Sequence, residues 1–450
     1  MTMFGSPWFG AEEAAYTVDN SCRFYSGDSA YLYRTPDDHG NRQTWTLSFW
    51  MKLGKIGGSR SVINTGLSGA YEVLELRTNK FLMRFNNVDR SNAATNVNTN
   101  DWAHFVWRVN TPGDSGDRNR LYVNGTEVSY TGTDASLNAS STAWNTSSYA
   151  NDIGTNRTTT FDGYLAEMIF LDGTSVGPGE FAETVDSVWV PKEFSGSYGT
   201  NGFYLDFADS ADLGADQSGN SNDFTSSGLA SGDQMKDSPT NNFSVFNPTA
   251  SPTPPIASWT QVNLGLNGGF SASVYAGMSA LVIPTDKKIY YEITCPGATG
   301  GYWGWGASTY GATPGSSNVG GDESVQVYNV SKFVNGSETG SYITLLAAGE
   351  IGMCAIDGAT RKVWFGREGT WVGDPAAGSD EAGIIDNASA KDLHVAVTAS
   401  AETIANFGAD SSFAGNETRQ NNADENGFGD FYYAPPSGFL ALCTKNGATL

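Results

Sequence analysis

Alternating apolar and polar positions predict β-strands along the first half of the chain. Between residues 45 and 52 every second side chain is large and apolar, and the intervening ones are polar except for Trp50. A period of two is typical of a strand with one buried face. Residues 105–109 repeat the pattern less regularly, and residues 165–171 form a third run. Asn124-Gly125 between two apolar runs predicts a hairpin, because a type I′ turn needs two residues with positive φ.

The second half of the chain shows the same kind of pattern. Asp357-Gly358 predicts another hairpin turn. No segment has a sustained helical period, so we expect only short helices and no coiled coil. The chain is therefore predicted to be all-β. The strand-like runs of this half are residues 289–294, 342–346, 351–356, 363–365, 393–398 and 404–407.

Changes in composition divide the chain into five parts. Residues 1–14 form a short N-terminal arm, and residues 15–195 and 256–411 are two β domains. Residues 196–255 are rich in Gly, Asp and Asn and end in a proline-rich run, which predicts a connector that is acidic and partly stiff. The C-terminal extension, residues 412–450, begins polar and ends apolar, so we expect it to pack back on the second domain.

Charge narrows the possible partners. The chain has 25 Lys+Arg against 48 Asp+Glu, a formal net charge of −23. This surface repels phosphate groups, which argues against nucleic acid and against anionic membranes as partners. No run approaches the 18 or more apolar residues of a membrane span, and the first residues do not resemble a signal peptide. We therefore expect synthesis in the cytoplasm, with the four scattered cysteines as free, mostly buried thiols.

Two stretches of the chain resemble known β-sandwich families. Residues 22–52, with Thr46 to Trp50 inside them, and the segment 161–173 resemble the successive strands of a laminin-G-like, concanavalin A-type module. Residues 349–375 and 393–408 resemble a SPRY-type module. Both families are jelly-roll-like, which agrees with the strand pattern. The resemblance thus implies two tandem jelly-roll-like β-sandwich domains behind a short N-terminal arm.

The combination of segments resembles structural proteins of tailed bacteriophages, especially marine ones. The segments FGSPWFGA, DQSGNSNDF and PPSGFLALCTKN carry this resemblance. It implies a virion component, assembled in the host cytoplasm, such as a tail fibre or receptor-binding protein that contacts a host-surface glycan or protein. It also implies a homotrimer. An architectural head fibre or capsid decoration without a ligand is the alternative.

The N-terminal arm carries three aromatic side chains that would be costly to leave in water. Phe4, Trp8 and Phe9 lie among glycines and one proline. We expect them to dock the chain onto other virion proteins, whereas a frayed terminus is the alternative.

Catalytic constellations are absent from the sequence. The three histidines, His39, His104 and His394, belong to no known catalytic motif. Glycosidases of the concanavalin A type need two facing carboxylates, but Glu72 and Glu75 are three residues apart and point to opposite faces of a strand. The pair Asp206 and Asp209 has the same spacing. A glycan-degrading enzyme is therefore the last-ranked hypothesis, and we expect no catalytic activity.

Two further groups of residues are candidate sites. Oxygen ligands are dense in the connector, which is compatible with Ca²⁺, although a solvated acidic loop is the alternative. Exposed aromatic rings beside polar groups would bind a sugar, although core packing is the alternative for these rings. The metal candidates are Asp212, Asp216, Asn220 and Asp223, and the sugar candidates are Trp303, Trp305, Tyr310 and Trp371.

Overall fold

The computed structural model divides the chain into two compact units, the first extending to Thr240 and the second running from Asn241 to Leu450. Each unit is described here by itself. The described residues are 16–54, 58–65, 72–77, 80–85, 88–89, 100–114, 116–129, 142–247, 258–260, 262, 264–267, 275–295, 303–309, 323–386, 391–399 and 402–450. Within these ranges the chain forms strands and short 3-10 turns, which confirms the all-β prediction. None of these turns has the length or hydropathy of a membrane-crossing helix.

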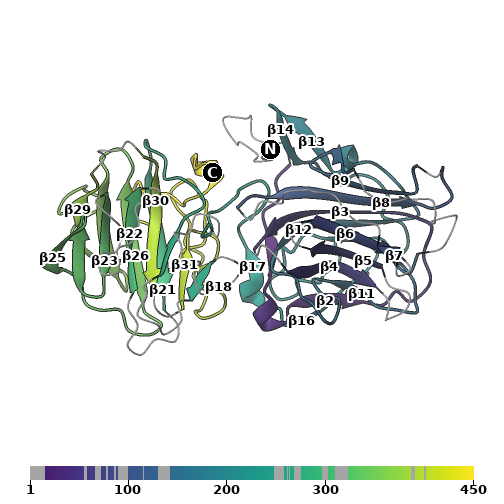
Figure 1. The fold of residues 1–450 in the computed structure, drawn as a ribbon, viewed down its shortest axis with the longest axis horizontal. Helices are drawn as coiled ribbons and strands as arrows, with labels where there is room; N and C mark the ends of the chain where they lie inside the picture. The colour runs from purple at the N-terminus through teal and green to yellow at the C-terminus, as the bar shows by residue number, and fades with distance from the viewer. Residues whose placement is uncertain are drawn as a thin grey trace. The chain divides into compact units, whose positions relative to one another are not determined.

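The first unit is a sandwich of two antiparallel sheets (Figure 1). The larger sheet has the order β10-β9-β8-β3-β12-β1-β17, with β15 paired to one end of β12, and the second has the order β16-β2-β11-β4-β5-β6-β7. The strands of the larger sheet are β1 (Ser21–Phe24), β3 (Thr44–Leu53), β8 (Ala103–Asn110), β9 (Asn119–Val123), β10 (Thr126–Glu127), β12 (Gly163–Asp172), β15 (Phe203–Leu205) and β17 (Gln234–Met235). Those of the second are β2 (Tyr31–Arg34), β4 (Ser59–Thr65), β5 (Glu72–Arg77), β6 (Lys80–Phe85), β7 (Val88–Asp89), β11 (Asn151–Ile153) and β16 (Thr225–Ser227).

Strand periodicity explains the core of the first unit. The alternating run 45–51 is β3, and its apolar side chains, including Trp45 and Phe49, are buried between the sheets. The runs 105–109 and 165–171 are β8 and β12. Asn124 and Gly125 both have positive φ in the turn from β9 to β10, as predicted.

The prediction that residues 196–255 form a connector is wrong for most of that range. Residues 203–207 and 224 supply phenylalanine and leucine side chains to the core of the first unit, and three short strands from residues 203–235 pair with its sheets. Residues 241–247 belong to the second unit, where Phe243 bridges to Cys443. The proline-rich remainder, 248–255, lies outside the described residues. Gly, Asp and Asn therefore mark tight turns between very short strands here.

The outer face of the larger sheet is covered rather than solvated. A hairpin of β13 (Ala182–Val185) and β14 (Val188–Pro191) adds to this unit, and Trp50 is 3% exposed although it points away from the core. Two buried ion pairs join early strands to the segment after β16: Arg23 with Asp233 at 2.8 Å and Lys52 with Asp237 at 2.7 Å. Burying these charges is tolerable because each has a partner.

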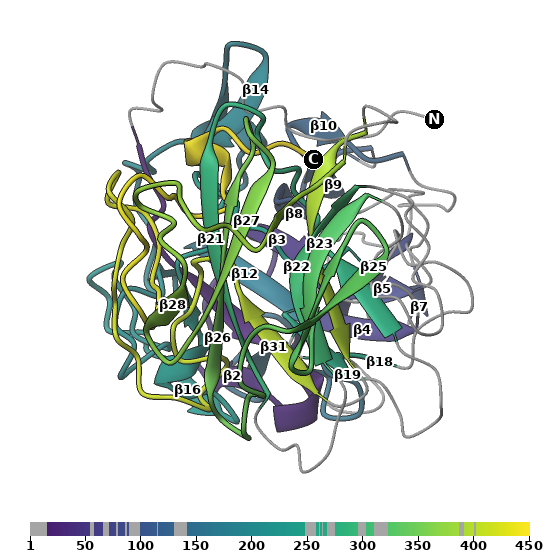
Figure 2. The same cartoon turned by 90° about the vertical axis from the view of Figure 1, so that its left-hand side faces the viewer.

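The second unit is also a two-sheet sandwich, whose layers are visible in Figure 2. One sheet has the order β18-β19-β31-β21-β26-β27-β28, with β29 paired to β27, and the other has the order β20-β30-β22-β23-β24-β25. The first contains β18 (Ser258–Thr260), β19 (Gly265–Asn267), β21 (Lys288–Thr294), β26 (Ile351–Asp357), β27 (Lys362–Arg367), β28 (Thr370–Val372), β29 (Gly383–Ile384) and β31 (Thr403–Asn406). The second contains β20 (Tyr275–Met278), β22 (Trp303–Thr309), β23 (Ser324–Tyr328), β24 (Ser331–Val334), β25 (Ser337–Ser341) and β30 (Leu393–Ala399).

Most of the strands predicted for the second unit are present. The exception is the run 342–346, which is a loop after β25 and not a strand. The turn predicted at Asp357-Gly358 joins β26 and β27 but takes four residues, 358–361. The C-terminal segment belongs to this unit, where the Tyr290 N–H donates to the carbonyl of Leu440.

Candidate functional site

The first candidate site lies on the outer face of the second sheet of the first unit. In β2, Leu32 points into the core, so the neighbouring Tyr31 and Tyr33 point outward, where both are half-buried. Their ring centroids are 5.8 Å apart. Asp152 of β11 is paired in register with Tyr33, which places its side chain on the same face. Asn64 of β4 is paired in register with Asp152 and donates to its carboxylate at 3.4 Å. We call Tyr31, Tyr33, Asn64, Asp152 and Arg157 the Tyr–Arg surface.

Arg157 is positioned by the turn that follows β11. It has a left-handed backbone (φ 68°), which is uncommon for a residue with a side chain. The Oδ1 of Asn156 accepts the backbone N–H groups of Thr158 and Thr159 at 3.0 and 2.6 Å, and Arg157 N–H donates to Thr155 Oγ1 at 2.9 Å. The turn thus fixes the conformation that directs the arginine back over the sheet.

The guanidinium of Arg157 is held on three sides. It donates to both carboxylate oxygens of Asp152, from Nε at 2.9 Å and from Nη2, and its Nη1 donates to the hydroxyl of Tyr31 at 3.2 Å. Its Cζ lies 4.7 Å from the ring centroid of Tyr31 and 5.2 Å from that of Tyr33. The hydrogen bonds to Asp152 raise the pKa of Arg157. Asp152 is 5% exposed and Arg157 is 44% exposed, so solvent reaches mainly the cation.

This arrangement matches the chemistry of saccharide binding. Aromatic rings pack on the apolar face of a sugar, while fixed donors and acceptors bind its hydroxyl groups. A bidentate arginine pair is rigid as well as charged, so its remaining N–H groups are held ready for a ligand.

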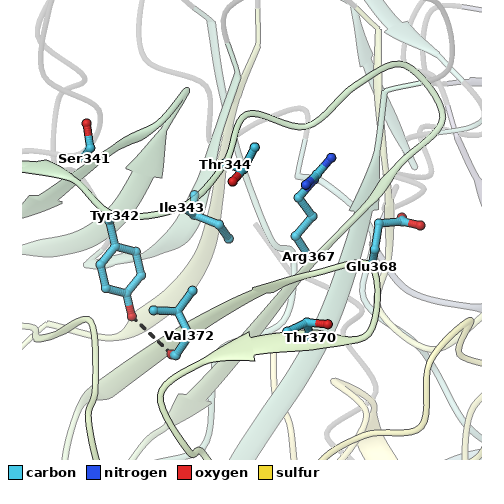
Figure 3. Close-up of a pocket in the computed structure, with 8 residues that line it drawn as sticks. All are labelled: Ser341, Tyr342, Ile343, Thr344, Arg367, Glu368, Thr370 and Val372. Atoms are coloured by element: carbon cyan, nitrogen blue, oxygen red, sulfur yellow. Dashed lines mark hydrogen bonds between the residues drawn. The ribbon is translucent and has the colours of Figure 1, made fainter.

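The second candidate site is a pocket of about 600 Å³ in the second unit (Figure 3). It lies between the loop after β25 and the β27–β28 hairpin, the final strands of the two sheets. The run wrongly predicted as a strand therefore provides one wall of the pocket. Its lining residues are Ser341, Tyr342, Ile343, Thr344, Arg367, Glu368, Thr370 and Val372.

An ion pair fixes the polar end of this pocket. Arg367 donates to both carboxylate oxygens of Glu350, from Nε at 2.8 Å and from Nη2. These hydrogen bonds hold the pKa of Glu350 below its usual value. Tyr342 donates its hydroxyl to the carbonyl of Val372 at 3.3 Å, which ties the loop to the hairpin (Figure 3).

Of the four predicted sugar-binding residues, the structure describes the side chains of Trp305 and Trp371. Trp305 is completely buried in the core, and its Nε1 donates to the carbonyl of Met353 at 3.2 Å. Trp371 of β28 packs over Gly366 and lies 6.0 Å from the ring of Tyr290. Because Thr370 and Val372 line the pocket, the alternation of β28 points Trp371 away from it. The side chain of Trp303 and all of Tyr310 lie outside the described residues.

The acidic loop binds its own backbone. The carboxylate of Asp216 accepts the backbone N–H groups of Tyr204, Ser218 and Asn222 at 2.8–2.9 Å. Asp223 accepts the N–H of Asp216, and Asp212 that of Gly214. Asn220 donates to the carbonyls of residues 199 and 202. Across the described residues, no three His, Cys, Asp or Glu side chains are grouped so that they could hold a metal ion.

The predicted docking residues Phe4, Trp8 and Phe9 lie outside the residues that the structure describes.

Buried titratable groups serve the scaffold. Burial lowers the pKa of His104 to about 3, and this neutral ring lies 2.8 Å from Ser48 Oγ and accepts a hydrogen bond from Trp189 Nε1 at 3.1 Å. His394, in β30, is also buried. The four cysteines are buried and free.

Two buried glutamates differ in their partners. Burial raises the pKa of both Glu167 and Glu292 to about 7, although the hydrogen bonds they accept oppose the rise. Glu167 sits at a bulge in β12 with φ 50° and accepts the hydroxyls of Tyr16 at 2.5 Å and Tyr204 at 2.9 Å. Glu292 accepts two backbone N–H groups, those of residues 432 and 433, besides two side-chain donors.

Sequence reasoning missed the Tyr–Arg surface, although one signal was present. Tyr31-Leu32-Tyr33 is a short alternation that places two rings on the face opposite a core leucine. The distance of more than 100 residues between these tyrosines and Arg157 hides the third member, because only strand pairing of β2 with β11 brings them together.

Comparison with known proteins supports the fold of the first unit. Residues 26–175, a third of the chain, match the family model of the concanavalin A-like lectin/glucanases superfamily. The chain thus contains a lectin-like sandwich, and because that superfamily includes lectins and glucanases, the match does not separate binding from catalysis. No curated protein matches the chain.

Solved structures show likenesses of fold alone. A heptameric SAP-like pentraxin from Limulus polyphemus is 12% identical, with 36% of this chain and 80% of the pentraxin covered, at a TM-score of 0.28. A Bacteroides ovatus protein described as a putative carbohydrate binding protein is 11% identical. The match covers 47% of this chain and 58% of that protein, at a TM-score of 0.35. The SPRY domain of human HERC1 is 14% identical, covering 36% of this chain and 96% of the domain, at 0.26.

Proposed function

We propose that this protein binds saccharides without modifying them, through the Tyr–Arg surface of its first unit. The observation that carries the proposal is the cation of Arg157, locked by Asp152 and lying over the rings of Tyr31 and Tyr33 on an outer sheet face. The match of this unit to a superfamily of lectins and glucanases supports a saccharide as the ligand.

The tyrosine rings and the guanidinium of Arg157 would contact different parts of a bound sugar. The tyrosine rings offer apolar area, and the N–H groups of Arg157 that Asp152 and Tyr31 leave unused would donate to sugar hydroxyls. Both oxygens of Asp152 already accept hydrogen bonds from Arg157. The carboxylate therefore holds the arginine in place and is not set up to attack or protonate a glycosidic bond.

A glycan array with the full chain tests this proposal. The double variant Tyr31→Ala, Tyr33→Ala should lose most of the signal, because stacking area and one hydrogen bond of Arg157 disappear together. Tyr149→Ala is the matched control, since Tyr149 is exposed on a separate turn of the same unit. Equal binding by the double variant and the control would rule out this surface, and a blank array for the wild type would favour the architectural alternative.

We further propose that the protein is a virion component, displayed as a tail fibre or receptor-binding protein for a host-surface glycan. The support is the resemblance of several segments to structural proteins of tailed bacteriophages. Residues 1–14, with Phe4, Trp8 and Phe9, would attach the chain to other virion proteins, and the chain would assemble as a trimer.

Deletion of residues 1–14 separates attachment from ligand binding. The truncated chain should bind the same glycans as the full chain but should fail to appear in purified particles. Normal incorporation of the truncated chain would contradict the docking role. Low-resolution imaging of labelled particles would show the copy number and whether the protein sits on the head or the tail.

A further inference from the structure

The pocket of the second unit has the size and position of a small-ligand site. A volume of about 600 Å³ lies within the usual range for small-molecule sites, roughly 300–1,000 Å³. It opens between β25 and β28, the terminal strands of the two sheets, so no further strand of either sheet covers it among the described residues.

A prepared hydrogen-bond donor faces this pocket. The Nε and Nη2 of Arg367 are both used by Glu350, which fixes the plane of the guanidinium. Its Nη1 has no hydrogen-bond partner within the described part of the chain, and Figure 3 shows the guanidinium between Thr344 and Glu368. A ligand acceptor can therefore be bound without any rearrangement of the arginine.

The charges of the pocket select against anions. Arg367 is the lining cation, and its charge is already balanced by Glu350, while Glu368 adds a carboxylate to the lining. Lys332 is the neighbouring cation, and it lies over the ring of Tyr342, with Nζ 4.7 Å from the ring centroid. A phosphate, sulfate or uronate would lose hydration on binding and would meet no uncompensated positive charge in the lining. A neutral ligand has no charge to desolvate and avoids this cost.

The rest of the lining suits a polyhydroxylated ligand. Ser341, Thr344 and Thr370 are exposed and offer hydroxyls that can both donate and accept. Val372 and the buried Ile343 give the pocket an apolar side. Fixed donors, adaptable hydroxyls and an apolar wall together match a sugar ring, which has hydroxyl groups at its edge and C–H groups on its face.

We infer that this pocket is a second saccharide site, selective for neutral sugars, so that one chain carries two independent sites. The inference rests on the proposed function of the protein as a saccharide binder but uses different residues in a different unit. Arg367 would donate to the sugar, Glu368 would accept from it, and the three hydroxyl side chains would complete the contacts.

Native mass spectrometry of the full chain counts bound sugars directly. The probes are maltotriose, cellotriose, laminaritriose and mannotriose, with trigalacturonic acid as the anionic counterpart. At saturation the wild type should bind two molecules of at least one neutral trisaccharide. The variant Tyr31→Ala, Tyr33→Ala should bind one, and so should the variant Thr370→Trp, which fills the pocket. Combining all three substitutions should abolish binding.

Two further variants control for side effects on folding. Ser337→Trp places the same bulky ring on an exposed position of β25 outside the pocket and should keep the wild-type count. Thr344→Ala with Thr370→Ala removes two hydroxyls without filling the pocket, and should weaken the second binding step about threefold to tenfold. Circular dichroism melting verifies that each variant is folded.

The outcomes separate this inference from the proposed function. One bound sugar that is lost with the tyrosines but not with Thr370→Trp overturns the second site and leaves the proposed function intact. One bound sugar that is lost only with Thr370→Trp supports the pocket and overturns the Tyr–Arg surface. Preference of the pocket for trigalacturonic acid overturns the selectivity, and no binding of any probe overturns both sites for these sugars.

Discussion

Both units of the chain expose a bidentate arginine–carboxylate pair, but the surroundings of the two pairs differ. The guanidinium of Arg157 lies over two tyrosine rings on an outer sheet face, whereas Arg367 lines a pocket between two sheet edges. In the second unit Trp305 packs against Phe365 in the core, and Trp364, on the opposite face of β27, is completely buried beside Phe439. An aromatic-rich segment therefore indicates a binding surface only when its strand phase points the rings away from the core.

The difference also extends to the buried glutamates. Glu167 of the first unit is bonded by hydroxyls, which can turn and serve as acceptors as well as donors. Glu292 of the second unit is bonded by backbone N–H groups, which can only donate. The first site thus tolerates a change of protonation, while the second site is built for an acceptor at both oxygens.

The buried ring of Trp305 and the half-buried ring of Tyr31 should differ most in how much they contribute to stability. Trp305→Ala should lower the free energy of unfolding of the second unit by about 3–5 kcal/mol, because it removes a completely buried indole and leaves a cavity. Tyr31→Ala should cost far less, since that ring is half-buried on a surface. Denaturant unfolding of each variant measures the free energy of unfolding. If Trp305→Ala lowers it no more than Tyr31→Ala does, the expected difference between the two rings is wrong.

Both glutamates should make stability depend on pH, and replacement by glutamine should distinguish them. Glu167 binds its proton more tightly in the folded chain than in the unfolded chain, where its pKa is about 4.5. Its stabilisation is therefore complete below about pH 4.5 and is lost as the pH rises through about 7, a total of about 3 kcal/mol. Glu167→Gln should remove this slope.

Glu292→Gln provides the counterpart to that experiment. The amide N–H₂ of the glutamine would face backbone donors, so this variant should be destabilised by about 1–3 kcal/mol even at pH 5. Thermal melts of both variants from pH 5 to pH 8 test the pair. If the two variants show the same change in melting temperature at each pH, the type of donor at the glutamate does not affect the stability of its glutamine variant.

A smaller effect is expected at the exposed cation of the first unit. Arg157→Lys keeps the charge but cannot form the bidentate pair with Asp152, so saccharide affinity at the Tyr–Arg surface should fall about tenfold. Binding at the pocket should be unchanged, which makes Arg157→Lys a test of the independence of the two sites. Titration of the wild type and the variant with the same array-selected glycan gives both affinities.

The smallest effect concerns the acidic loop of the first unit. Asp216→Asn should reduce stability by about 1 kcal/mol, because the amide replaces an acceptor that caps three backbone N–H groups. Addition of Ca²⁺ or of a chelator should shift the melting temperature of neither chain. A Ca²⁺-dependent rise that disappears in Asp216→Asn would identify this loop as a metal site instead.

Local alternation made much of the fold predictable. β3, β8, β12 and the Asn124-Gly125 hairpin follow from side-chain period and turn chemistry, which depend on near neighbours only. Residues 203–235 were misread because their strands are two or three residues long, too short to show a period. The pocket loop was misread for the opposite reason, since its apolar run continues through residues that do not pair.

The candidate sites were less predictable than the strands, because they depend on pairing between distant segments. Arg157 meets Tyr31 across more than 100 residues, and Arg367 meets the loop of Tyr342 only at the sandwich edge. Trp305 shows the converse error. It was a candidate for an exposed sugar-binding ring, yet its glycine neighbours allow the strand to pack closely; a Cβ on Gly306 would lie 2.1 Å from the carbonyl oxygen of Val325.

The pairing of Lys52 with Asp237 has a consequence for how the chain is made. The lysine leaves the ribosome about 185 residues before its partner, a delay of roughly 10–40 s at about 5–20 residues per second. During that interval β3 has already been synthesised, but the aspartate that balances Lys52 on its outer face does not yet exist. The segment after β16, which holds Asp233 and Asp237, is therefore the last part of the first unit to be added. A nascent chain released before residue 237 would carry an incomplete sandwich.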